Sequence, residues 1–140
     1  MGLVLALDGR KRALNTRLRN LNTNEVFRYH LYKNNYTPVD GQLIGDYTEC
    51  TYTGYATQDV AAAGWGSPTD DGTCSTSVAA AQTYTSTGGT ADTAYGYYVT
   101  STADGALLWG EKFGTPVDMS VAGRSTILVP TYQAKTGTPC

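Results

Sequence analysis

Apolar and polar residues alternate along residues 25–33, and this period of two predicts a β-strand with two different faces. One face carries Phe27, Tyr29 and Leu31, and the other carries Arg28, His30 and Tyr32. Less regular patterns predict further strands within residues 47–60, 74–84 and 125–135, separated by segments rich in glycine, proline, asparagine or aspartate. Because Pro130 lacks a backbone N–H, we expect the last strand to lie at an edge or to contain a bulge.

Residues 95–113 predict a β-hairpin, with an Asp-Gly turn signal between two strand-like runs. A loop of residues 103–105, with Gly105 in the left-handed region, places Val99 opposite Trp109. A two-residue loop would mix polar and apolar side chains on each face, so the longer loop is the one we expect. The side chains expected on the core face are Tyr95, Tyr97, Val99, Leu107, Trp109 and Phe113.

Leucines at helical spacing accompany a cluster of basic residues near the start of the chain. Leu14, Leu18 and Leu21 recur every three or four residues, which predicts a short amphipathic helix. The basic residues among them are Arg10, Lys11, Arg12, Arg17 and Arg19. One interpretation is a solvated cationic face with the leucines packed against the sheet. The other is an arm that docks on an acidic protein surface.

Composition favours one all-β domain. The 140 residues include 16 glycines and 11 tyrosines, and only 16% are charged, which favours short strands and turns over long helices. Strand blocks without long intervening helices predict an antiparallel β-sandwich of immunoglobulin-like or jelly-roll-like type. We therefore expect a basic arm or short helix over residues 1–24 and the sandwich over residues 25–140.

Charge is divided unequally along the chain. Residues 1–33 carry seven bases and two acids, a net charge of +5, whereas residues 34–140 carry three bases and ten acids, a net charge of −7. The acidic body would repel phosphates and no recognition motif accompanies the basic cluster, so we expect no nucleic-acid partner. The apolar runs are too short to span a bilayer and no targeting signal is evident. These features predict a soluble protein, synthesised in a cytoplasm, with no membrane partner.

Residues able to perform catalysis are few and scattered. We expect His30, the only histidine, to face solvent rather than to join a catalytic triad. Asp70 and Asp71 precede a glycine, and a turn explains them, because their spacing matches neither a calcium loop nor a glycosidase carboxylate pair. Trp65, between two glycines, is either an exposed contact for a sugar or partner or is packed over a sheet edge. We expect no catalytic residue, metal or cofactor.

Three cysteines form an odd set without the spacing of a metal site. We expect Cys50 and Cys74 to behave as small buried apolar residues and Cys140 to be a terminal thiol, which fits a reducing compartment. A bond between Cys50 and Cys74 across neighbouring strands stays open.

Several segments resemble a pattern that recurs in small virion proteins of tailed bacteriophages. They are the leucine-rich N-terminal arm, the strand RYHLYKNN at residues 28–35, the Tyr-Thr-Glu run at residues 47–49, the Gly-Tyr pair at residues 54–55, YGYYV at residues 95–99 and LLWGEKF at residues 107–113. The chain is thereby similar to capsid decoration, or cement, proteins, which are compact β domains on the outside of an assembled head. The alanine-rich stretch of residues 59–81 and the cysteines depart from the pattern.

The resemblance implies a structural function in the virion and no enzymatic activity. A protein of this kind binds the exterior of the head and stabilises contacts between major capsid subunits. The implied partners are the major capsid protein and copies of the chain itself, as a homotrimer, with the basic cluster of residues 10–19 as the contact. The alternative is a tail or fibre module that recognises a host glycan or another tail protein, and Trp65 is its candidate contact.

Overall fold

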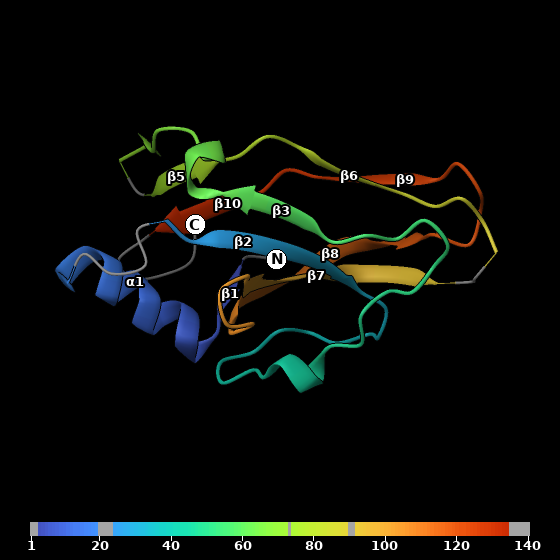
Figure 1. Ribbon diagram of the computed structural model, residues 1–140, viewed down its shortest axis with the longest axis horizontal. Coiled ribbons are helices and arrows are strands. Elements are labelled where there is room, and N and C mark those ends of the chain that lie inside the picture. The colour runs from blue at the N-terminus through green and yellow to red at the C-terminus, as the bar shows by residue number, and fades with distance from the viewer. Residues whose placement is uncertain (1–2, 20–23, 73, 90–91, 135–140) are drawn as a thin grey trace.

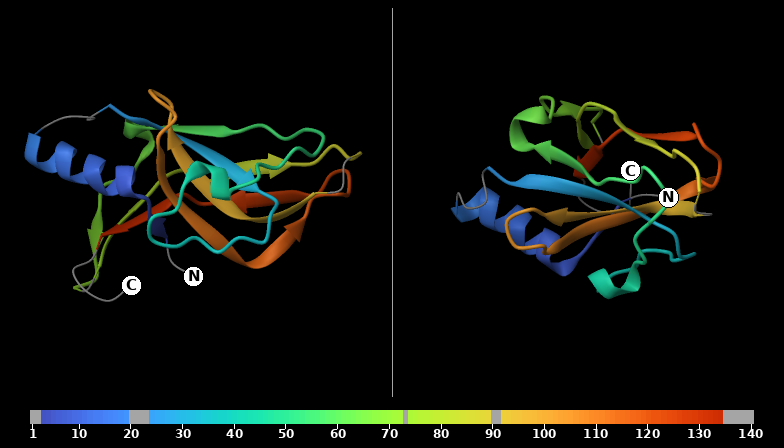
Figure 2. Two further views of the ribbon diagram at one scale, coloured as in Figure 1. Left: turned by 90° about the horizontal axis from the view of Figure 1, so that it is seen from below. Right: turned by 45° about the vertical axis from the view of Figure 1, so that its right-hand side comes forward.

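The strands form two layers packed face to face (Figures 1 and 2). The computed structural model describes residues 3–19, 24–72, 74–89 and 92–134, with the side chains of all of these except Arg17 and Ala134. The expected all-β sandwich with a short N-terminal helix is confirmed.

The first layer is a five-stranded antiparallel sheet in the order β1, β8, β7, β2, β3. Its strands are β1 (Val4–Leu5), β2 (Val26–Tyr32), β3 (Gln58–Ala61), β7 (Thr93–Ser101) and β8 (Leu107–Asp118). The alternation predicted for β2 is confirmed, because Tyr29 and Leu31 are buried between the layers while Tyr32 is buried on the opposite face. Because β1 pairs with β8, residues before position 24 contribute a strand to the sandwich itself.

The second layer consists of two ladders that meet end to end. One has the order β10 (Thr131–Ala134), β5 (Ser75–Val78), β4 (Thr69–Asp70), and the other pairs β6 (Gln82–Thr85) with β9 (Ser125–Leu128). Each of the strands predicted within residues 74–84 and 125–135 is therefore divided in two. The division falls where the Ala79 N–H donates to the Pro130 carbonyl at 2.9 Å, at the proline expected to interrupt a ladder.

Residues 47–57 are not the strand that their composition predicts. They form turns and a single bridge to Tyr32, and only the end of the predicted region, β3, is a strand. Cys50 and Tyr52 are nevertheless buried in the core between the layers, so the burial expected for Cys50 is confirmed although the backbone conformation is not. Gly54, with φ of 90°, allows a close approach of residues 85–87.

The hairpin of β7 and β8 has the expected register in its central part. Val99 lies opposite Trp109 and Tyr97 opposite Glu111, and Gly105 has a φ of 72°. The pairing shifts beside Thr100, so that Thr100 rather than Ser101 lies opposite Leu107. This bulge places Leu108 in the core between the layers.

Two expected core-face residues therefore lie on the other face of the sheet. Leu107 and Tyr95 pack with Tyr98 and Tyr47, on the side away from the second layer. Tyr95 is displaced by a second irregularity, between Ala94 and Gly96.

Helix α1 (Leu7–Arg19) and the segment that contains the 3-10 turn η1 (Ile44–Asp46) lie on that same outer side of the five-stranded sheet, as Figure 2 shows in its right-hand view. A second 3-10 turn, η2 (Ala62–Gly64), follows β3. The two faces of the sheet are therefore covered differently: one by a complete second layer, the other by a helix and an irregular segment.

Candidate functional site

Helix α1 is rich in residues with high helix propensity, and its ends suit the helix dipole. Alanine, leucine, lysine and arginine make up most of Leu7–Arg19. Asp8 lies in the first turn, and Arg19 ends the helix, so negative and positive charges lie at the ends that they stabilise. The helix predicted from the leucine spacing is confirmed.

The side of α1 that contacts the sheet is narrow and carries no leucine. Gly9 is buried against β8, where a Cβ would collide with the carbonyl oxygen of Leu108. The same carbonyl accepts a hydrogen bond from the Ala6 N–H at 2.8 Å. The close approach of helix and strand at this point requires glycine.

Arg12, one turn further along, fixes the helix to the tip of the hairpin. Its guanidinium forms ion pairs with Glu25, which precedes β2, and with Asp104 in the β7–β8 turn. The side chains of Arg12 and Glu25 are both largely buried. Arg12 was a candidate contact for the capsid; its charge is paired within the chain, so the surface described below does not include it.

The leucines of α1 lie on the opposite side of the helix and face solvent. At 100° per residue, Leu7, Lys11, Leu14 and Leu18 form one stripe, roughly opposite Gly9. The exposed fractions of Leu7, Leu14 and Leu18 are 56%, 60% and 74%. The expectation that Leu14 and Leu18 pack against the sheet is wrong, and Leu21 lies outside the described residues.

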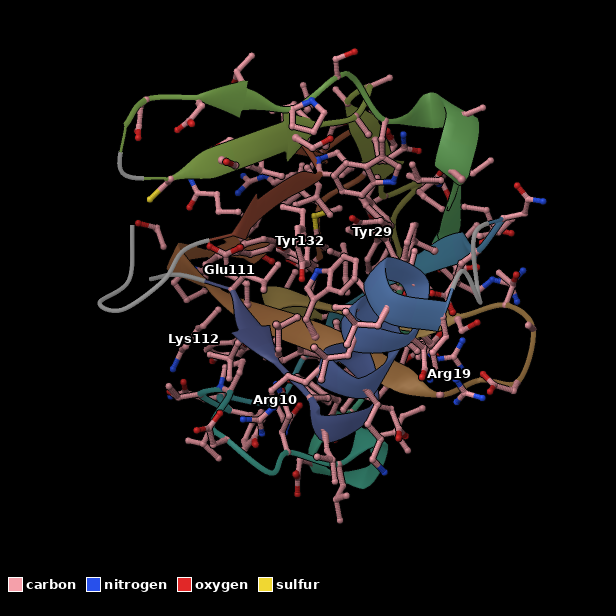
Figure 3. The ribbon with its side chains drawn as sticks, turned by 90° about the vertical axis from the view of Figure 1, so that its left-hand side faces the viewer. Arg10, Arg19, Tyr29, Glu111, Lys112 and Tyr132 are labelled. Carbon is pink, nitrogen blue, oxygen red and sulfur yellow. The ribbon has the colours of Figure 1, made fainter. Side chains whose placement is uncertain are left out.

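Three cations of α1 remain accessible: Lys11 within the leucine stripe, Arg10 beside it and Arg19 at the end of the helix. Arg10 is 3.7 Å from Asp40 and Lys11 is 3.9 Å from Asp8, and all four side chains are substantially exposed, so these pairs are weak. Arg19 contacts the Asn15 side chain at 3.5 Å. Figure 3 shows Arg10 and Arg19 toward opposite ends of the helix.

Exposed apolar residues continue beyond the start of the helix. Val39, Leu43 and Ile44 are exposed on the segment that Arg10 reaches through its pair with Asp40. The Gln42 amide donates to the Val4 carbonyl at 2.7 Å and so holds the same segment against β1. We call the leucine stripe of α1, the cations Arg10, Lys11 and Arg19, and the residues Val39, Leu43 and Ile44 the α1 surface.

Sequence reasoning found the cations of this surface and two of its leucines, Leu14 and Leu18, but not their orientation. It did not single out Leu7, Val39, Leu43 and Ile44. The spacing of the leucines gave the helix and its apolar side. The signal for orientation was Gly9, since a buried glycine opposite an apolar stripe marks the side of a helix that lies against backbone.

His30 is the centre of a polar cluster. It was expected to face solvent, but its side chain is only 12% exposed. Its Nδ1 lies 2.8 Å from Glu49 Oε1, its Nε2 lies 2.9 Å from Thr100 Oγ1, and its ring stacks on Tyr98 with centroids 4.5 Å apart. This order of carboxylate, imidazole and hydroxyl is that of a catalytic triad. However, Thr100 is only 4% exposed and lies within the sheet, so a substrate carbonyl has no approach to its oxygen. The cluster provides hydrogen-bond partners for Glu49, His30 and Thr100 on the outer face of the five-stranded sheet.

The acidic pair in the 70–72 turn has the role expected from sequence. Asp70 accepts from the Gly72 N–H at 3.0 Å, and Asp71 accepts from the Cys74 N–H at 2.7 Å. Within the described residues, no group of three histidine, cysteine, aspartate or glutamate side chains is placed to hold a metal ion.

Trp65 is packed against the core and is only partly exposed. Its edge contacts Phe27 with centroids 5.9 Å apart, and its indole N–H is buried. The packed alternative for Trp65 is therefore confirmed, whereas a contact of its partly exposed ring with a sugar or partner stays a prediction.

Cys50 is unbonded as expected, whereas Cys74 is not. Cys50 is a free thiol in the core, and burial raises its pKa to about 12. Cys74 is buried and disulfide-bonded, so the prediction of an unbonded Cys74 is wrong and the two cysteines do not pair with each other. The prediction for Cys140 lies outside the described residues.

Comparison of the chain with protein-family models, with curated proteins and with solved structures found no match. Among the described residues, no helix is long and apolar enough to cross a membrane. Any functional assignment therefore depends on the chemistry of the surface and on the sequence resemblance.

Proposed function

We propose that the chain is a capsid decoration protein that binds the outside of an assembled phage head through the α1 surface. The resemblance of the sequence to decoration proteins gives the class of function. The orientation of α1 supports a docking role, because its leucines point away from the molecule that it belongs to.

The observation that carries the proposal is the exposure of the three leucines of the stripe. Burying a whole leucine side chain is worth roughly 1.5–3 kcal/mol, so leaving three of them more than half exposed forgoes much stabilisation. An amphipathic helix that presents leucines at this spacing is suited to an apolar groove on a partner. Lys11 within the stripe, Arg10 beside it and Arg19 at the end of the helix favour a groove with an acidic rim.

The proposed partner is the major capsid protein where neighbouring subunits meet. A few leucines supply only modest affinity for one contact, but copies held together around a symmetry axis bind many times more tightly than one. Binding only to the assembled lattice shifts the equilibrium toward that lattice. Association of the chain into a homotrimer is part of the proposal.

The first prediction concerns the double variant Leu14→Glu/Leu18→Glu. Both side chains are exposed, so the variant should fold with an unchanged unfolding midpoint, yet its occupancy on heads assembled without the chain should fall at least tenfold. Occupancy is measured by co-sedimentation and by cryo-electron microscopy of the particles. Val121→Glu is the matched control, since Val121 is an exposed apolar residue of a distant loop.

Two outcomes would contradict this proposal. Equal occupancy of the double variant and the control would remove the α1 surface as the contact. Flotation of the unmodified chain with anionic phospholipid vesicles, lost in the double variant, would make α1 an interfacial membrane helix instead.

A further inference from the structure

A groove runs along the free side of β8, between the two layers. Its volume is about 440 Å³. Residues 111–115 and 117 of β8 and its bulge form one wall, and residues 126–129 and 131 of the second layer form the other. Tyr97 of β7 also lines it. The groove is separate from the α1 surface, which lies on the outer side of the sheet.

Irregular pairing of β8 shapes this groove. Gly96 lies opposite Lys112 and Ala94 lies opposite Val117, so four residues of β8 arch outward opposite Tyr95 alone. Pro116, which donates no backbone hydrogen bond, lies within the arch. Residues 113–115 of this arch line the groove.

Two strand edges border the groove. Among the described strands, β1 pairs with β8 only at Trp109 and Gly110, which leaves residues 111–118 without a strand on that side. On the opposite wall, β9 pairs only with β6 within the described part of the chain. Backbone donors and acceptors of an unpaired edge bind an extended chain by adding a strand.

Glu111 places a carboxylate in the groove without a cation beside it. The Tyr97 hydroxyl donates to Glu111 Oε2 at 2.7 Å, and no bond to the other oxygen and no ion pair are found within the described residues. Tyr97 is only 3% exposed, and burial, followed by the nearby Glu111, raises the pKa of its hydroxyl, which therefore stays protonated as a donor.

The neighbouring lysine does not neutralise this carboxylate. Lys112 Nζ is 2.5 Å from Asn35 Oδ1 and 3.2 Å from Thr37 Oγ1, on the outer side of the sheet. Figure 3 shows Glu111 and Lys112 on opposite sides of β8. A half-buried carboxylate fixed by a buried tyrosine and lacking a cation is an electrostatic complement for a positive group that enters the groove.

The remaining walls select the shape of that positive group. The Phe113 ring lies 6.3 Å from the Tyr97 ring, and Leu128 faces them from the second layer. An apolar stem that ends in a cation can bury its methylenes against such walls while its charged end reaches a carboxylate and an aromatic face. Arginine and lysine side chains have this form.

We propose that the groove binds an extended segment of a partner protein, which adds to the free edge of β8 and inserts an arginine or lysine side chain toward Glu111. Backbone pairing along residues 111–115 gives the segment its orientation. The inserted side chain gives specificity, because a neutral side chain would leave the half-buried carboxylate without a counter-charge. The proposal does not depend on the function of the α1 surface.

The test uses the full chain, labelled for NMR, and the peptide acetyl-Val-Arg-Val-amide as the probe. Addition of millimolar peptide should shift the amide signals of residues 111–115 and 126–129 saturably. The same peptide with citrulline in place of arginine keeps the size and hydrogen-bonding capacity but lacks the charge, and it should bind at least tenfold more weakly.

Glu111→Gln should reduce the affinity for the arginine peptide to that for the citrulline peptide. Asp118→Asn is the matched control, since it removes one negative charge from the end of the same strand outside the groove. It should bind the arginine peptide as the unmodified chain does. Equal binding of the two peptides, an unchanged affinity in Glu111→Gln, or an absence of saturable shifts in the unmodified chain would each overturn the proposal.

Discussion

A single glycine decides how closely helix and sheet approach each other in this molecule. Gly9 lies against the Leu108 carbonyl, and that carbonyl also accepts a hydrogen bond from the N–H of Ala6, the residue before the helix. Any side chain at position 9 must push the helix away from β8 and weaken this bond. The orientation of α1, and with it the exposure of the leucines, depends on this contact.

Gly9→Ala should therefore lower the free energy of unfolding, although alanine is the better helix former. The gain in helix propensity is about 1 kcal/mol, whereas the collision with backbone that cannot rotate away costs about 1–3 kcal/mol. We expect a net loss of about 1 kcal/mol in urea unfolding. Gly45→Ala is the control, because no atom lies within 4 Å of the added Cβ, and its midpoint should change little. Equal midpoints for the two variants would show that α1 is not held at Gly9.

Sequence reasoning at this scale succeeded where side chains alternate regularly. The register around Val99 and Trp109 followed from matching apolar residues across the turn. The bulge that exchanges Leu107 for Leu108 did not follow, because both are leucines and the pattern is equally apolar with either one inside. Which leucine is buried between the layers depends on tertiary packing.

At the scale of elements, α1 is held by a polar clamp rather than by an apolar face. Arg12 connects the helix to Glu25 and to Asp104, while the leucines that would normally anchor a helix are left outside. The sequence predicted the helix, but hydrophobic spacing alone gave the wrong inward side. A pair of residues as far apart in the sequence as Arg12 and Asp104 cannot be predicted from the local spacing of apolar residues.

Arg12→Met should loosen the helix. The change leaves Glu25, whose side chain is 9% exposed, without its counter-charge, so we expect a loss of about 1–3 kcal/mol and faster hydrogen exchange of the α1 amides. Lys11→Met removes an equal charge from an exposed, weak pair and should change stability by less than about 0.5 kcal/mol. Hydrogen exchange followed by mass spectrometry compares the two. Unaltered protection of α1 in Arg12→Met would contradict the clamp.

At the scale of the whole molecule, tyrosine is the main large residue of the interior. Burial is the leading cause that raises the pKa of these tyrosines: Tyr29, Tyr32, Tyr36, Tyr47, Tyr52, Tyr55, Tyr84, Tyr97, Tyr98 and Tyr132. Composition predicted the β class correctly, since tyrosine and threonine favour strands. The way in which the second layer divides into two ladders was not predicted, because it depends on which distant strands meet.

Stability should fall steeply in alkali because of these phenols. In the unfolded chain tyrosines lose their protons near pH 10, whereas the buried ones hold theirs to higher pH. Above about pH 10 the unfolded state binds fewer protons than the native state, so the free energy of unfolding decreases as pH rises. Urea unfolding from about pH 8 to about pH 11 measures this decrease. A tyrosinate absorbance titration that is the same for the folded and the urea-unfolded chain would contradict the prediction.

The end-to-end ladders of the second layer also set an order of events during synthesis on the ribosome. The five-stranded sheet is complete once residue 118 has emerged. In the second layer, however, β6 has its partner in β9, and β5, which also pairs with β4, has its second partner in β10; β9 and β10 are the last strands of the described chain. Until then the aromatic face around Tyr29, Val99 and Trp109 lacks the cover that β9 and β10 provide. A nascent chain paused between residues 118 and 134 therefore exposes an aggregation-prone apolar face of the sheet. This is the interval of synthesis in which a chaperone would be needed.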